Sequence, residues 1–157
     1  SWQPSQLIRL MKLFQKIKIV FTFPKEKVTD ELVVKIVTEG AELAVKSAKA
    51  FHFMLDYSDA SIKTVDKVLK KVKVHYANQE KELSNYGLIF GLYCIAVLER
   101  NHGKGFIERK YEADGPDDFP YLRNNQLIFP CMWCSHFLFY EDVPDVWSQF
   151  NEVVEME

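Results

Sequence analysis

The chain has 157 residues, of which 48% are hydrophobic and 27% charged, a balance typical of one globular domain and unlike that of a disordered segment. Its net charge of −2 gives no overall attraction to nucleic acid or anionic lipid. Residues 1–80 carry 14 Lys and Arg against 9 Asp and Glu, whereas residues 81–157 carry 6 against 13. Either the surface is bipolar and binds a partner, or the two halves intermix in the fold; we prefer the second interpretation, because charge separation along a sequence is weak evidence of separation in space.

The cysteines and the longest apolar stretch indicate a compartment. Three cysteines, Cys94, Cys131 and Cys134, do not form the even-numbered framework of a disulfide-rich secreted protein. No signal-peptide pattern is present. The longest apolar stretch, 86–98, is shorter than the roughly 20 residues of a membrane span. We therefore expect a soluble, cytoplasmic protein with no membrane partner.

Two elements are predicted before Pro24. Residues 5–14 have the spacing of an amphipathic helix, with Leu7, Leu10, Met11 and Phe14 on one face. From 17 to 23 apolar residues alternate with others, which favours a strand ended by Pro24. A helix that continues through 17–23 is the alternative.

Two further helices are predicted in the first half. The first is capped by Thr29 or Asp30 and extends to about Phe51. The second begins with Ser58 as its N-cap. Its buried face comprises Ile62, Val65, Val68, Leu69 and Val72, and its other face mostly carries Lys63, Lys67, Lys70, Lys71 and Lys73. Because no aromatic or arginine residue lies between these lysines, we expect a solvated face and not a phosphate-binding one.

The most apolar helix is predicted over 82–101. It is apolar on nearly every side from 86 to 98, which is typical of a buried central helix. Gly87 and Gly91 share one of its faces, and each is unfavourable in a helix unless another backbone approaches closely. Gly103 suits a left-handed C-cap.

The C-terminal part changes to a mixed pattern. A strand is predicted over 106–111, a loop over 113–118, and a hairpin of 121–123 with 126–129 around Asn124 and Asn125. A short helix over 131–140 follows Pro130, and a last helix is predicted with Asp142 as its cap and Pro144 in its first turn. These elements predict a helix-rich α+β fold: a single domain over 1–157 with a buried central helix and a small antiparallel sheet toward the C-terminal half.

The pair Cys131 and Cys134 is the sharpest candidate for catalysis. Two thiols spaced C-x-x-C at a helix N-terminus can form a thiolate stabilised by the helix dipole, with the second thiol resolving a mixed disulfide. The pair lies after a hairpin, however, and not in the βαβ unit that thioredoxin-like proteins use. Two small apolar residues in a core explain the same spacing.

No metal, cofactor or other catalytic site is predicted. A zinc site would combine Cys131, Cys134 and His136 with His102 or His75, but the fourth ligand lacks a paired spacing. The sequence has no nucleophile elbow with a Ser-His-Asp order and no glycine-rich phosphate loop.

Three segments carry a resemblance. They are Leu55-Asp56-Tyr57-Ser58 leading into 61–66, then Gly91-x-Tyr93 through Arg100-Asn101-x-Gly103, then 127–130 with the helix after it. Over about residues 50–155 the chain resembles a family of small, uncharacterised bacterial domains with an L-D-Y-S helix start and a central helix of the form G-x-Y-x-G-E-x-x-x-R-N-x-G-G-x-W.

The departures from that pattern bear on function. This chain has Ile95 and Ala96 in place of the family's Gly and Glu, and Lys104 and Phe106 in place of its second Gly and Trp. Tyr93, Arg100 and Asn101 match, so the resemblance makes them candidate binding residues. It implies a fold more than any reaction.

We therefore expect a non-catalytic interaction or regulatory module of a bacterial cytoplasm, of which an immunity-type protein that blocks a toxin is one concrete form. The alternative is a thiol-disulfide oxidoreductase using Cys131 and Cys134, so enzyme activity stays open, with non-catalysis favoured. The expected partner is a protein, not nucleic acid, and the chain is a monomer or homodimer.

Overall fold

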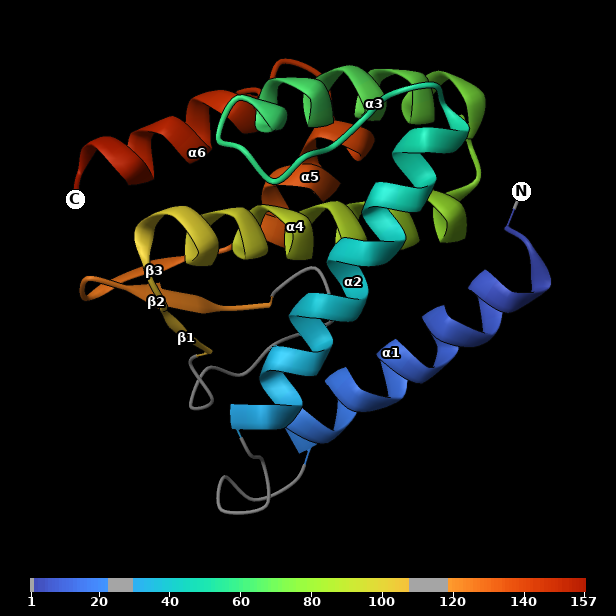
Figure 1. Ribbon diagram of the computed structural model, residues 1–157. Coiled ribbons are helices and arrows are strands. Elements are labelled where there is room, and N and C mark those ends of the chain that lie inside the picture. Colours follow the sequence, from blue (N-terminus) through green and yellow to red (C-terminus); the bar gives the residue numbers. More distant parts are fainter. Residues whose placement is uncertain (1, 23–29, 108–118) are drawn as a thin grey trace.

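The computed structural model describes residues 2–22, 30–107 and 119–157, arranged as in Figure 1. The described residues form six helices and a three-stranded antiparallel sheet, so the fold is helix-rich α+β. In chain order the elements are α1 (Pro4–Thr22), α2 (Asp30–Ala50), α3 (Ser61–His75), α4 (Glu80–His102), β1 (Phe106–Ile107), β2 (Tyr121–Arg123), β3 (Gln126–Ile128), α5 (Pro130–Phe139) and α6 (Val146–Glu155).

Helix α4 is the centre of the molecule, as predicted. All its residues from Asn85 to Leu98 are buried, because α2 crosses one side of it and α5 packs against another (Figure 1). Helix α3 lies beside α5 and α6, and α1 packs outside α2. A helix enclosed in this way needs apolar side chains around its whole circumference.

The predicted close approach at the glycines of α4 is confirmed. A Cβ atom at Gly91 would lie 2.2 Å from Cα of Cys131, and one at Gly87 would lie 3.2 Å from Cα of Ser135. At Gly91 the closest atoms belong to the backbone of α5, whereas at Gly87 the closest atom is the side-chain hydroxyl oxygen of Ser135. Gly91 therefore allows α4 and α5 to pack at a separation that a Cβ atom would prevent.

The hairpin is confirmed. Strands β2 and β3 pair with Leu122 opposite Leu127, and the turn residues Asn124 and Asn125 have φ of 48° and 63°, as a two-residue hairpin turn requires. Strand β1 pairs with β2 and completes the order β1-β2-β3. Gly103 ends α4 with a positive φ of 89°, but its ψ of 167° lies outside the left-handed helical region. The predicted left-handed C-cap is therefore not formed.

The strand predicted over 17–23 is wrong where the structure describes it, and the alternative of a continuous helix is right: α1 extends to Thr22. The buried side of α1 contains Leu10, Leu13 and Ile17, which recur at helical spacing. Leu7 and Met11, predicted on the buried face, are exposed. Because α1 packs chiefly against the single helix α2, it buries only a narrow stripe.

Two predicted helix starts are displaced. Ser58 does accept the amide N–H of Ser61 at 3.2 Å with its hydroxyl oxygen, but it caps a short turn of i→i+3 bonds and α3 itself begins at Ser61. Asp142 does not cap α6; it has φ of 57°, whereas an N-cap needs an extended backbone. Asp145 is the cap, and its carboxylate accepts from the amide of Ser148 at 2.7 Å.

Part of the predictions falls outside the described residues, namely Phe23, Pro24 and Thr29, the end of the strand at 108–111 and the loop at 113–118. Within the described ranges, no helix combines the length and apolarity that crossing a membrane requires.

Candidate functional site

The three residues that carry the resemblance lie on α4 and meet the loop that precedes α3. The Tyr93 hydroxyl accepts the amide N–H of Tyr57 at 2.9 Å and lies 2.7 Å from the hydroxyl of Ser61. Burial raises the pKa of Tyr93 to about 12, so this hydroxyl stays protonated. Asn101 donates to the carbonyl of Tyr57 and to the carboxylate of Asp59, both at 2.9 Å.

Arg100 contacts the same loop through an aromatic ring. Its guanidinium carbon lies 3.5 Å from the centre of the Tyr57 ring, a cation–π contact. The hollow beside it, between α2 and α4, has a volume of only about 160 Å³, below the usual range for an organic ligand. Tyr93, Arg100 and Asn101 therefore fasten the loop at 55–59 to α4.

A second set of ties fixes the end of α4. His102 lies 2.6 Å from the carboxylate of Asp59, and Arg123 of β2 donates to the carbonyls of His102 and Gly103 and to the carboxylate of Glu157. These hydrogen bonds connect the end of α4 to the sheet. It is Arg123, a buried residue without a sequence motif, that makes this connection.

Cys131 and Cys134 come together with Cys94 in the interior. All three are fully buried thiols that form no disulfide, and the Sγ of Cys131 donates to the carbonyl of Leu88 at 3.5 Å. Burial raises the pKa of Cys134 well above its usual value, and a hydrogen bond to Cys94 raises it further. A reactive cysteine needs the opposite surroundings, exposed and electropositive.

The histidines considered for zinc are dispersed. His75 ends α3, His102 lies near the end of α4, and His136 is exposed on α5. Among the described residues, no three His, Cys, Asp or Glu side chains are arranged to hold a metal ion.

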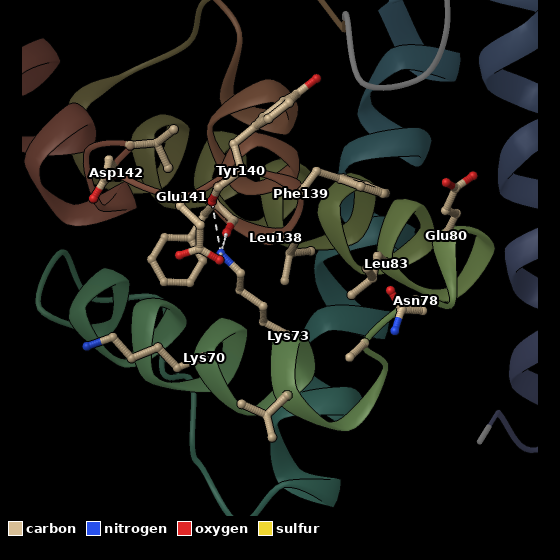
Figure 2. A pocket seen from close by; sticks show the side chains of 14 residues that line it. Lys70, Lys73, Asn78, Glu80, Leu83, Leu138, Phe139, Tyr140, Glu141 and Asp142 are labelled. Atoms are coloured by element: carbon tan, nitrogen blue, oxygen red, sulfur yellow. Dashed lines mark hydrogen bonds and ion pairs between the residues drawn. The ribbon is translucent and has the colours of Figure 1, made fainter.

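A hollow lies between α3 and the end of α5, and we call it the α3–α5 groove (Figure 2). Its volume is about 930 Å³. Its walls combine apolar and aromatic side chains with both signs of charge. They include Val74, Leu83, Phe137, Phe139, Tyr140, Lys70, Lys73, Glu80, Glu141 and Asp142.

Lys73 belongs to the framework of this groove and not to its free surface. Its ammonium group donates to the carbonyls of Phe137 and Tyr140 at 3.0 and 2.9 Å and pairs with Glu141 at 3.2 Å (Figure 2). These carbonyls lie at the C-terminal end of α5, where a cation is favourable. Lys73 therefore fixes the end of α5 against α3.

A second hollow opens on the other side of α3, and we call it the lysine hollow. Its volume is about 660 Å³. It is lined by Phe51, Phe53, Lys67, Lys70, Lys71, Val74 and His75. Lys70 and Val74 border both hollows, so the two form one continuous surface across α3.

The sequence predicted a solvated lysine face on α3, and Lys67, Lys70 and Lys71 are indeed exposed. The aromatic residues beside these lysines were not predicted. The aromatic residues, Phe51 and Phe53, come from the segment after α2, which folds against α3. A cue was present in Val74, an apolar residue outside the buried face of the predicted helix.

Comparison with known proteins adds no relative: no protein-family model matches the chain, and neither do the curated proteins or the solved structures at a significant level. The resemblance over 50–155 therefore stays a prediction.

Proposed function

We propose that this chain is a non-catalytic protein-binding module, and that its binding face is the surface formed by the α3–α5 groove and the lysine hollow. An immunity-type protein that blocks a toxin in a bacterial cytoplasm is one concrete form of the proposal.

The observation that carries the proposal is the position of Val74. This side chain is 80% exposed, at the ridge between the two hollows. Phe139 and Tyr140 are exposed on the far wall of the α3–α5 groove. An apolar ridge flanked by aromatic residues and rimmed by charges is the composition of a protein interface.

The sites considered for catalysis support the same proposal. The thiols are buried, and the matched residues of α4 are engaged in holding the loop at 55–59. The thiol-disulfide alternative would require Cys131 and Cys134 to ionise inside the core, where the charged form is disfavoured.

The test uses the full chain as bait in an extract of the cells that make it. We compare the wild type with Val74→Asn and with Met156→Asn; Met156 is an exposed apolar residue at the C-terminal end of the chain. A partner retained by the wild type and by Met156→Asn, but lost with Val74→Asn, supports the proposal. Equal recovery with all three proteins, or no specific partner together with turnover of a metabolite, contradicts it.

A further inference from the structure

The charge in the lysine hollow is of one sign. Lys67, Lys70 and Lys71 are exposed on one side of α3, and no acidic residue lines the hollow among the residues described. Lys63 and Lys73, by contrast, contact the ring of Trp147 and the end of α5. Three like charges on adjacent helix turns repel one another, so an anionic partner would relieve an existing cost.

Asp66, which lies on the same helix, does not form an ion pair with these lysines. Asp66 interacts electrostatically with Lys70, but it is buried and its two oxygens accept the amide N–H groups of Val146 and Trp147 at 2.8 and 2.9 Å. For Lys67, Lys70 and Lys71 the described part of the chain shows no ion pair. Their ammonium groups are therefore available to a ligand.

The opposite wall of the hollow is aromatic and held in place. The Phe51 ring makes edge contacts with His75 at 6.0 Å and with Tyr86 at 6.3 Å between ring centres, and Phe53 is half-buried beside the core. A hollow of about 660 Å³ with a fixed apolar wall accepts a large apolar side chain without rearrangement.

We infer that the lysine hollow receives an acidic segment of the protein partner, in which carboxylates pair with Lys67, Lys70 and Lys71 while one large apolar side chain lies against Phe51 and Phe53. This inference rests on the proposed function and specifies the chemistry of the partner.

Two features favour a protein segment over a nucleic acid. The helix rises only about 6 Å from residue 67 to residue 71, which matches two or three neighbouring carboxylates better than a phosphate chain that needs a long cationic track. Beyond Val74, the surface continues into the α3–α5 groove, where Glu80, Glu141 and Asp142 repel a polyanion.

The experiment selects peptides from a phage-displayed random library on the immobilised full chain. Selected peptides are then measured against Lys67→Glu/Lys70→Glu/Lys71→Glu and against a control with the same charge change, Lys12→Glu/Lys18→Glu/Lys104→Glu, whose lysines are exposed elsewhere. Circular dichroism establishes that both variants fold. A single-stranded oligonucleotide and phosphatidylserine vesicles are measured in parallel.

The expected peptides contain several Asp or Glu and one large apolar residue. We expect them to bind the α3 variant at least about tenfold more weakly than the control, and to lose affinity when that apolar residue is replaced by Ala. The inference is overturned if the selection yields no acidic peptides, or if the selected peptides bind both variants equally. It is also overturned if the α3 variant loses binding to the oligonucleotide or the vesicles but not to the peptides. A partner could be lost with Val74→Asn and yet bind Lys67→Glu/Lys70→Glu/Lys71→Glu as strongly as the wild type. That result would overturn the inference, whereas the proposed function would stand.

Discussion

Gly91 is the residue on which the packing of α4 against α5 depends. The atoms closest to its missing Cβ are the backbone Cα and N of Cys131, at 2.2 and 2.5 Å, and backbone atoms cannot move aside as a flexible side chain does. The thiols of α5 and the groove at its far end are both positioned by this contact.

We expect Gly91→Ala to lower the free energy of unfolding by about 1–3 kcal/mol, the usual cost of overpacking. Helix propensity alone would raise the free energy of unfolding by about 1 kcal/mol. A decrease therefore indicates that position 91 is crowded by α5, and an increase indicates that it is not. Lys67→Ala, at an exposed site, should change it by only about 0.5 kcal/mol. Thermal melts measure both; a Gly91→Ala variant as stable as the wild type would contradict the close packing of α4 and α5.

The buried thiols lead to a prediction about reactivity. Because Cys94, Cys131 and Cys134 are inaccessible and burial raises the pKa of Cys134, we expect alkylation by iodoacetamide to be slow at every pH at which the chain stays folded. The rate should rise to that of an ordinary thiol in denaturant. Mass spectrometry of the labelled cysteines provides the measurement, and rapid labelling of Cys131 near neutral pH would revive the oxidoreductase alternative.

At the scale of elements, the sequence predicted most where a local pattern has only one explanation. The apolar circumference of α4 and the Asn124–Asn125 turn are of this kind, and both predictions are confirmed. The pattern over 17–22 has two explanations, since Ile17 fits an alternating strand and also continues the helical stripe of Leu10 and Leu13. The packing of this segment against α2 decides between strand and helix, and the sequence does not give the position of α2.

The start of α6 also depends on a distant residue. Asp66, on α3, accepts the amide N–H groups of Val146 and Trp147, which are among the amides that a helix N-terminus leaves without a partner. The local signals, Asp142 and Pro144, gave the wrong start because the cap is shared between Asp145 and a residue about 80 positions earlier.

We expect Asp66→Asn to destabilise the protein by about 1–3 kcal/mol, since the amide NH₂ group replaces an acceptor and leaves a buried N–H without a partner. Asp145→Asn is the control at the exposed side of the same helix start. It should cost less than about 0.5 kcal/mol, because Asn and Asp are similar N-caps. Equal effects in denaturant melts would show that Asp66 does not hold α6.

Asp66 also predicts a pH dependence. Burial raises its pKa in the folded protein above the reference value of 3.8, and the two amide hydrogen bonds offset only part of that effect. Between these two pKa values the unfolded chain has already released the proton while the folded chain still holds it, so the contribution of this group to stability falls as pH rises. The stability advantage of the wild type over Asp66→Asn should therefore be greatest below pH 3.8 and decline above it; an advantage that grows with pH over this range would contradict the assignment.

At the scale of the molecule, the candidate surface was beyond the reach of sequence reasoning because its walls come from distant segments. The lysine hollow joins 51–53 to α3, and the α3–α5 groove joins α3 and the start of α4 to 137–143. The sequence did provide three candidate residues, Tyr93, Arg100 and Asn101. They lie close together in the chain and in the structure, where they hold the loop at 55–59 against α4. Local motifs located residues that stabilise the fold, whereas the surface proposed for binding has no contiguous motif.

A partner bound as proposed covers the ridge at Val74 and the hollows beside it. Hydroxyl-radical footprinting of the chain with and without its recovered partner tests this most directly, because it reports the exposure of individual side chains. We expect Phe139 and Tyr140 to lose reactivity on binding, while Phe106 and Met156, which are exposed elsewhere, keep theirs. Unchanged reactivity of Phe139 and Tyr140 in the complex, or protection centred on Phe106 or Met156, would contradict it.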